Sequence, residues 1–212
     1  PHVGSDWKGV MAMLTISINS GLLESACDLF RCPAATGRQA FLEGSRPFFH
    51  WGRQTGVTGA AAMIERIEQD RLNYDELLID HTRLFVNSFP QARAHPFAGW
   101  YLGDEAYFSN QAEKMRDFYA RHGLQMDDDL SWPADHIMVE LEFAAVMMES
   151  YEISGDQRYL LALQELADHL DSWMPIFTAA MFEQAESDFY GIAAEILQSL
   201  LTVLHSEMKG GA

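Results

Sequence analysis

The sequence predicts an all-α protein that folds as a single helical bundle of about eight to ten helices. Apolar residues recur at the three- and four-residue spacing of a helix almost throughout the 212 residues. The strict alternation of apolar and polar residues that marks a half-buried strand is not found, and no segment repeats. Hydrophobic residues make up 48% of the chain, which is enough for a sizeable core.

Turn residues divide the first half of the chain into helices and loops. Pro33 ends the first helical stretch, and Thr58 is a candidate cap for a later helix. Asn73 followed by Glu76 resembles a capping box, which predicts a helix start at this point. In chain order, the expected elements are a helix or helix pair over 7–30, a short helix over 33–42, a Gly-rich aromatic loop over 44–59, a helix from 58 to 70, a helix over 73–87 and a loop over 90–103.

Helix boundaries in the second half are marked in the same way. Gly123 is typical of a helix C-terminus, Asp156 of an N-cap and Pro175 of a first helical turn. The expected elements are a helix over 110–122, an acidic turn at 127–129, a long helix from 133 that breaks near 154–155, a helix over 156–173, a helix from 175 and a final helix over 187–206. We expect one domain over 1–212; two lobes joined near 123–132 or 154–155 are the alternative.

The start of the long helix is the most informative stretch of the sequence. Pro133 is tolerated in a first helical turn, and the helix dipole favours a negative charge on Asp135 in the same turn. His136 can change its charge near neutral pH. We expect Asp135 and His136 at the surface. The apolar residues that follow at helical spacing are expected to form a buried face, made of Ile137, Leu141, Ala144, Ala145 and Met148.

The plainest interpretation of this motif is a capped helix with an exposed histidine. Asp135 with His136 could instead form an acid–base pair, but adjacent helical residues point about 100° apart. His136 and Glu140 have the i, i+4 spacing of two metal ligands, yet no His-Glu-x-x-His string supplies a third. We therefore expect no catalytic residue, no metal and no cofactor.

Pro133-Ala134-Asp135-His136, followed by a Glu-Leu-Glu-Phe helix, resembles the signature of the TorD/DmsD family. The resemblance covers about 72–205 and leaves the first sixty residues outside; members often carry a tryptophan where His81 stands. Other stretches that match the family in order are 82–86 with its Arg-Leu-Phe, the aromatic loop 95–102, and the landmarks Trp173, Phe189 and Tyr190, which are expected to pack in the core.

Members of this family are cytoplasmic chaperones for redox enzymes that are exported by the twin-arginine route. The resemblance implies binding to the twin-arginine leader peptide and the catalytic subunit of a molybdenum-cofactor oxidoreductase. The chaperone would assist cofactor insertion and prevent premature export, without catalysis of its own. Assembly of a non-exported, nitrate reductase-like subunit without leader recognition is the alternative. The peptide-binding residues implied by the resemblance are His81, Leu84, Phe85, Pro96, Phe97, Trp100, Pro133, Asp135 and His136.

The charge of the chain agrees with a basic peptide as partner. The sequence has 31 acids against 14 bases, a net charge of −17. Residues 1–60 hold four acids and five bases, so the excess of acid lies in residues 61–212. Nucleic acid is an unsuitable partner because its phosphates require Lys and Arg. An acidic surface attracts cations, and Asp104 and Glu105 are candidate partners for the arginines of a leader.

The sequence also allows a prediction of the cellular compartment and of the oligomeric state. Two cysteines, Cys27 and Cys32, fit no disulfide framework and are expected to be reduced and partly buried. We see neither a signal peptide nor an apolar run of membrane-spanning length, so we expect a cytoplasmic protein without stable membrane insertion. The turn at 154–155 could act as a hinge, so we expect a monomer or a helix-swapped dimer.

Overall fold

The computed structural model describes residues 18–86, 92–103, 110–127 and 132–210. Within these ranges the chain forms eleven α-helices, one π-helical turn and no strand, which confirms the predicted all-α bundle. The elements are α1 (Ser20–Asp28), α2 (Pro33–Thr36), α3 (Arg38–Gln54), α4 (Ala60–Glu68), α5 (Tyr74–His81), the π-helical turn η1 (Thr82–Val86), α6 (Ala98–Tyr101), α7 (Asn110–Arg121), α8 (Ile137–Ser154), α9 (Gln157–Asp171), α10 (Met174–Gln184) and α11 (Asp188–Gly210). The helix expected over 7–17 and the acidic turn at 128–129 lie outside the described residues.

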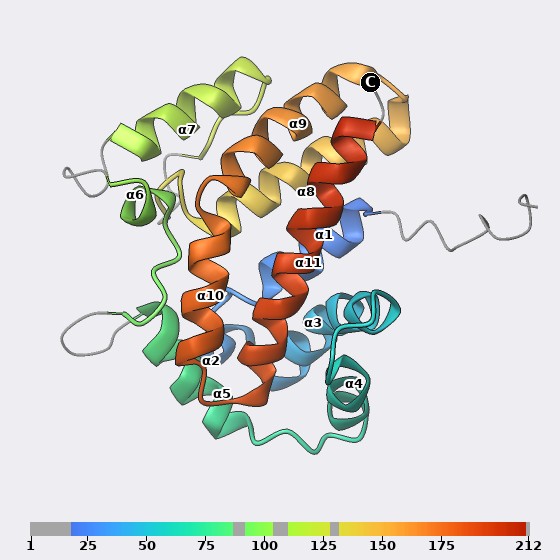
Figure 1. Cartoon of the computed structure of the whole chain (residues 1–212), viewed down its shortest axis with the longest axis vertical. Helices are drawn as coiled ribbons and strands as arrows, with labels where there is room; N and C mark the ends of the chain where they lie inside the picture. The colour runs from blue at the N-terminus through green and yellow to red at the C-terminus, as the bar shows by residue number, and fades with distance from the viewer. Residues whose placement is uncertain (1–17, 87–91, 104–109, 128–131, 211–212) are drawn as a thin grey trace, which may run out of the picture.

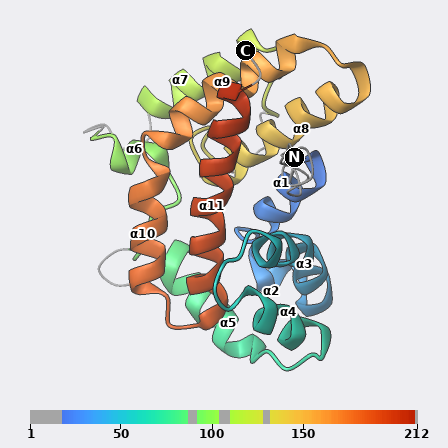
Figure 2. The same ribbon diagram turned by 45° about the vertical axis from the view of Figure 1, so that its right-hand side comes forward.

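Helix α11 organises the packing of the bundle. It contacts α3, α5, α9 and α10, and Figure 1 shows it in red, running from the lower to the upper part of the molecule beside α10. Helix α8 packs against α1 and α9, while α3 packs against α1 and α4. The turned view in Figure 2 keeps α10 and α11 side by side. Elements distant in sequence therefore meet around one long helix.

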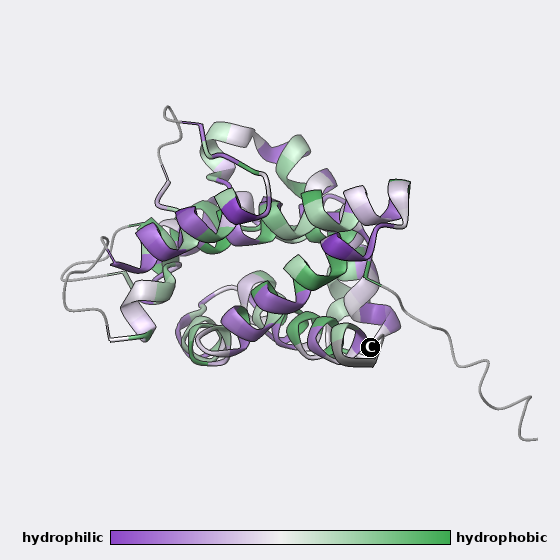
Figure 3. Cartoon of the chain, turned by 90° about the horizontal axis from the view of Figure 1, so that it is seen from above, coloured by the Kyte–Doolittle hydropathy of each residue, from purple (hydrophilic) through white to green (hydrophobic). Residues whose placement is uncertain are grey.

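The buried apolar side chains form one cluster that includes residues from α1 to α11. Trp173, Phe189 and Tyr190 are at most 1% exposed, so their expected place in the core is confirmed. Figure 3 shows hydrophobic and hydrophilic residues alternating along the helices, as amphipathic packing requires. The inward face predicted for α8 is also confirmed, because Ile137, Leu141, Ala144, Ala145 and Met148 are all buried.

Several helix ends follow the predicted caps. The Asn73 side chain accepts from the Glu76 N–H at 3.5 Å, and the Asp156 side chain accepts from the Arg158 N–H at 3.0 Å. Gly155 ends α8 with a φ of +69°, a backbone conformation that residues with a Cβ atom rarely adopt. These local signals were sufficient to place the starts of α5 and α9 and the end of α8.

The Gly-rich aromatic loop predicted over 44–59 is wrong, because α3 continues through it to Gln54. Phe48, Phe49 and Trp51 are buried, and this burial outweighs the low helix propensity of glycine. Gly52 permits a close helix crossing: a Cβ atom there would lie 2.5 Å from Cγ1 of Ile196 in α11. This glycine was therefore a sign of tight packing and not of a loop.

A side chain from α1 accommodates the proline inside α3. Pro47 interrupts the helix at a point where the next N–H, that of Phe48, donates to Oγ of Ser25 at 3.0 Å. The Ser25 hydroxyl in turn donates to the Gly44 carbonyl oxygen at 2.5 Å. The Ser25 hydroxyl thus bridges the Phe48 N–H and the Gly44 carbonyl oxygen next to the proline, which is a recognised way to satisfy a disturbed helix.

Candidate functional site

Three segments that resemble the TorD/DmsD family meet in the structure, and we call this place the junction: η1, residues 94–99 and the start of α8. The Ala94 N–H donates to the Leu84 carbonyl oxygen at 2.9 Å, which joins the second segment to η1. The Ile137 N–H donates to the Pro96 carbonyl oxygen at 2.9 Å, which joins it to α8. Backbone hydrogen bonds therefore hold together three segments that are separate on the chain.

Asp135 fixes the short helix α6 to the start of α8. It is fully buried, and its Oδ2 accepts from the Gly99 N–H at 3.0 Å. Its backbone carbonyl accepts from the Ala98 N–H at 3.0 Å. Ala98 and Gly99 are the first two residues of α6, so Asp135 acts as the cap of that helix. Pro133 lies in the preceding turn, where its carbonyl oxygen accepts from the His136 N–H at 3.0 Å.

His136 is the N-cap of α8, one residue before the helix begins. Its Nδ1 accepts from the Met138 N–H at 3.1 Å, which assigns the ring proton to Nε2. The ring is covered by Phe97 at 5.0 Å and Trp132 at 4.5 Å between ring centroids. Burial, with a smaller contribution from His81, lowers the pKa of His136 to about 3. The imidazole is neutral at physiological pH.

The expected surface exposure of the motif is therefore wrong. Asp135 is 0% exposed and His136 is 2% exposed. The helix also starts later than predicted, at Ile137, so Asp135 does not lie in its first turn. The physical reason is tertiary: the 94–99 segment pairs with the start of α8, and Trp132 folds over the imidazole.

His81 approaches the junction from α5. Burial lowers its pKa to about 4, and its Nε2 lies 3.5 Å from the Phe30 carbonyl oxygen. Its ring contacts Phe85 at 5.3 Å and Tyr190 at 6.1 Å between centroids. The neutral imidazole of His81 is thus embedded among aromatic rings.

The junction brings the predicted peptide-binding residues together, but most of their side chains are buried there. Three of them keep part of their surface: Phe97, Trp100 and Pro133. Trp132 is 37% exposed and was not predicted, although its position directly before Pro133 was visible in the sequence. The residues that the structure buries are His81, Leu84, Phe85, Pro96, Asp135 and His136. Asp104 and Glu105, the candidate arginine partners, lie outside the described residues.

Beneath the junction, a buried ion pair that the sequence did not predict joins α8 to α9. Oε1 of Glu140 lies 2.9 Å from Nε2 of His169, and the Glu140 side chain is fully buried. Burial raises the pKa of Glu140, with His169 opposing the rise. Burial alone would lower the pKa of His169, but the Glu140 carboxylate outweighs it and raises that pKa. The spacing of Glu140 from His136 suggested a pair within α8, whereas its partner comes from the next helix.

The stability that Glu140 and His169 contribute to the fold depends on pH. Both groups have raised pKa values in the folded protein, so the folded state holds more protons than the unfolded chain. Stability from Glu140 is lost as the pH rises above its ordinary pKa of 4.5, and stability from His169 as the pH rises above 6.5. The pair is therefore a source of stability that weakens towards alkaline pH.

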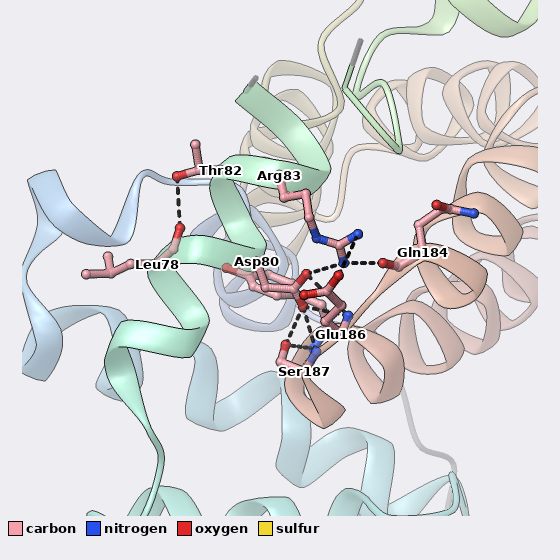
Figure 4. A network of polar contacts seen from close by, with 8 residues as sticks. Leu78, Asp80, Thr82, Arg83, Gln184, Glu186 and Ser187 are labelled. Carbon is pink, nitrogen blue, oxygen red and sulfur yellow. Dashed lines mark hydrogen bonds and ion pairs between the residues drawn. The ribbon is translucent and has the colours of Figure 1, made fainter. Parts of the chain in front are cut away.

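A second polar network was also missed, and it anchors η1 to the turn between α10 and α11 (Figure 4). Asp80 is 2% exposed and accepts from the N–H and Oγ of Ser187 at 2.8 and 2.7 Å, and from the Glu186 N–H at 3.1 Å. Arg83 donates to Asp80 at 2.8 Å, to the Gln184 carbonyl oxygen, and pairs with Glu186 at 3.3 Å. The i, i+3 spacing of Asp80 and Arg83 was the only signal of it in the sequence.

The described residues offer no group of three or more His, Cys, Asp or Glu side chains that could hold a metal ion. The two cysteines are free thiols: Cys27 is buried and Cys32 is exposed. None of the helices found in the described ranges is both long and apolar enough to cross a membrane.

Comparisons with known proteins decide the family. A family model described as "Nitrate reductase delta subunit" matches residues 53–179, more than half of the chain and all three segments of the junction. The chain belongs to this family. Its relatives include the chaperone protein TorD of Vibrio parahaemolyticus, 31% identical over 128 residues, which are 58% of this chain and 59% of that protein. The TorD chaperone of Aliivibrio fischeri is 28% identical over 157 residues, 70% and 71% of the two chains. The resemblance to TorD is thereby confirmed.

These matches cover part of each protein. The chain spans about 60% of the length of the Vibrio TorD chaperones that it matches. A crystal structure of a putative redox enzyme maturation protein from Archaeoglobus fulgidus has the same fold, with a TM-score of 0.58 and 20% identity over 88% of this chain and 95% of that one. The fold agreement thus extends beyond the 53–179 family match.

Proposed function

We propose that this protein is a chaperone for the maturation of a redox enzyme, and that it binds the client's twin-arginine leader peptide at the junction. The observation that carries the proposal is the meeting of the three family segments at one place, through the Pro96–Ile137 and Leu84–Ala94 backbone bonds. Family membership and the TorD relatives support the same class of function. The client we propose is the catalytic subunit of a molybdenum-cofactor oxidoreductase, held in the cytoplasm until its cofactor is inserted.

The burial of the junction changes how a peptide would bind there. Asp135 and His136 would not contact the peptide; they would hold α6 and the aromatic side chains in place from the interior. The direct contacts would be made by the partly exposed Phe97, Trp100 and Trp132, because aromatic side chains dominate binding energy at such surfaces. The net charge of −17 would attract the basic end of the leader. No catalytic step is required for this function.

The test is a calorimetric titration with leader peptides from the molybdoenzymes of the same genome, each beside a copy in which both arginines are Gln. We expect micromolar binding to one leader, weakened by salt and by the Gln replacements. Trp132→Ala should weaken this binding at least tenfold, whereas Ile153→Ala, on a residue 79% exposed near the far end of α8, should leave it unchanged. Equal binding by both variants would remove the junction as the site.

A second candidate function is supported by the description of the matched family. A nitrate reductase delta subunit family suggests a client that resembles nitrate reductase and is not exported, so that no leader is recognised. The two functions differ in whether the client peptide must contain a pair of arginines. Binding to an N-terminal peptide of a nitrate reductase-like subunit that lacks paired arginines, with no binding to any leader, would favour this alternative. For either client, the protein is proposed to act as a monomer or a helix-swapped dimer, which light scattering distinguishes.

A further inference from the structure

Helix α6 is too short to keep its shape without support. It has four residues, Ala98–Tyr101, whereas an isolated helix shorter than about 12–15 residues is only marginally stable in water. Trp100, which the proposed function places against the peptide, belongs to this helix and is partly exposed. The orientation of its ring therefore depends on the side chains that hold the two ends of α6.

Two buried side chains hold these ends. Asp135 holds the first end, because its side chain accepts from the Gly99 N–H and its backbone carbonyl accepts from the Ala98 N–H. Trp173 holds the other end: its ring stacks on that of Tyr101, with 5.7 Å between the centroids and 20° between the ring planes. Trp173 is 0% exposed and directly precedes α10. Helix α6 is thus fixed by a carboxylate at its start and by an indole at its end.

Glu140 lies beside both of these side chains. Burial is the main cause of its raised pKa; His169 and the Trp173 side chain oppose the rise, and Asp135 adds to it. Within the described part of the chain, neither Oε2 of Glu140 nor Nε1 of Trp173 makes a hydrogen bond of regular geometry, so each is the polar neighbour of the other. Glu140 therefore connects the side chains that hold the two ends of α6.

His169 supplies the positive charge that balances Glu140. Its Nε2 lies 2.9 Å from Oε1 of Glu140, and its side chain is 17% exposed, so the imidazole can exchange its proton with water. Against the effect of burial, Glu140 and Asp135 raise the pKa of His169. Loss of this proton would leave the Glu140 carboxylate buried beside Asp135 without the cation that balances it, which is a costly arrangement in a protein interior.

The other charged side chains around His169 do not replace Glu140 as its partner. Lys114 of α7 opposes the rise in the pKa of His169 that Glu140 causes. His205 of α11 pairs with Asp168 of α9 instead, at 3.7 Å. Helix α10 carries no charged residue from Met174 to Phe182. The proton on His169 is therefore held by the two carboxylates that lie beneath the junction.

Stability alone does not account for this buried pair. Helices α8 and α9 already pack through buried apolar side chains, among them Ala144, Met148, Leu163 and Leu166. Replacing a buried ion pair with apolar residues of similar size is often neutral or stabilising. Buried titratable groups are concentrated at functional sites, and this pair lies directly beneath a candidate site.

We propose that Glu140 and His169 are positioning residues of the junction: the ion pair keeps Trp173 and Asp135 in place, and thereby fixes α6 in the orientation in which Trp100 receives the leader peptide. The inference rests on the proposed function. It goes beyond that function by assigning a role in peptide binding to a fully buried carboxylate and its partner on α9, which act through other residues.

This role makes leader binding depend on pH in an unexpected direction. Because the pair requires the His169 proton, the affinity for the leader should fall as the pH rises above 6.5. Overall charge predicts the opposite trend. A chain of net charge −17 becomes more negative as its histidines lose protons, and it then attracts a basic peptide more strongly.

The first test measures α6 in the free protein. Hydrogen exchange of the Gly99 N–H, followed by NMR, reports directly on the bond to Asp135. The double variant Glu140→Met/His169→Leu replaces the pair with apolar side chains of similar size, so the fold should be retained. We expect exchange at Gly99 to become about tenfold faster, while the N–H of the buried Leu197 in α11 exchanges as in the wild type.

The second test is a titration with a leader peptide that lacks His and Cys and has blocked ends, so that its charge stays constant. The double variant should bind about tenfold more weakly than the wild type at pH 6.5, and its affinity should not fall at higher pH. His205→Leu is the matched control, because it breaks another histidine–carboxylate pair of α9. It should keep the wild-type exchange rate at Gly99, the wild-type affinity and the wild-type pH profile.

The outcomes separate this inference from the proposed function. Unchanged exchange at Gly99 in the double variant, or equal acceleration at Gly99 and Leu197, overturns the positioning role whether or not a leader binds. Faster exchange at Gly99 alone, without binding of any leader, supports the hold of the pair on α6 and removes leader recognition. Leader binding by the double variant with wild-type affinity overturns the positioning role and leaves leader recognition intact. The pH profile of the wild type needs no variant, and an affinity that is constant or rises with pH also overturns the role.

Discussion

Replacing Asp80 with alanine tests whether the network in Figure 4 holds the bundle together. The change removes an acceptor that is 2% exposed and takes bonds from Arg83, Glu186 and Ser187. Two backbone N–H groups at the start of α11 would lose their partner, and Arg83 would lose its buried counter-charge. Loss of a helix cap costs about 1 kcal/mol, and breaking a buried ion pair about 3–5 kcal/mol.

The expected loss lies at or just below the lower end of the combined range of about 4–6 kcal/mol. The Arg83 side chain is 21% exposed and keeps its contact with Glu186, so water and this second carboxylate compensate in part. We therefore expect Asp80→Ala to lower the free energy of unfolding by about 3–4 kcal/mol. For a chain of this size, that loss corresponds to a fall in Tm of roughly 6–16 °C.

Urea and thermal unfolding, followed by circular dichroism at 222 nm, measure this loss. Asp188→Ala is the control: it removes an exposed carboxylate from the same helix start, where it pairs with Arg66 at 3.0 Å, and should cost less than about 1 kcal/mol. A double-mutant cycle with Arg83→Met should give a coupling energy above about 1 kcal/mol. A loss below 1 kcal/mol for Asp80→Ala would refute the inference that this network is a principal link between η1 and α11.

Three other predictions follow from contacts in the helices. Ser25→Ala removes the hydroxyl that bridges the interrupted hydrogen bonds of α3, and should cost about 1–3 kcal/mol in urea unfolding; a neutral result would mean that water substitutes for it. Gly52→Ala forces a methyl group against Ile196 and should cost about 1–3 kcal/mol, and the double mutant with Ile196→Ala should lose less stability than the sum of the two single losses; additive losses would place the strain elsewhere. The wild type should lose stability as the pH rises above 6.5, and His169→Gln should reduce this slope because it removes the proton held beside Glu140; an unchanged slope would exclude the pair as its source.

Local chemistry explains why most of the fold could be predicted from the sequence. Asn73, Asp156 and Gly155 act on their own helix ends through contacts within four residues, so their roles were visible in the chain itself. The periodicity of α8 likewise placed Leu141 and its neighbours in the core. Signals of this kind can be recognised without knowing how the rest of the chain folds.

The errors arose where distant segments decide the outcome. In the sequence, Gly52 cannot be distinguished from a loop glycine. In the structure, the close approach of α11 requires a residue without a side chain at this position. Asp135 and His136 carry polar side chains that favour the surface, yet the 94–99 segment and Trp132 cover them. The family resemblance pointed to segments that meet at the junction, whereas only the structure could place most of their side chains in the interior.

The partners of Asp80 lie 106 and 107 residues further along the chain. At a synthesis rate of about 5–20 residues per second, helix α5 leaves the ribosome roughly 5–20 s before the turn that it caps. Of the partners that they have in the folded protein, Asp80 and Arg83 have only each other during that time. The residue that caps the start of α11 is therefore synthesised well before the turn that it caps, and this cap can form only after both segments have been made.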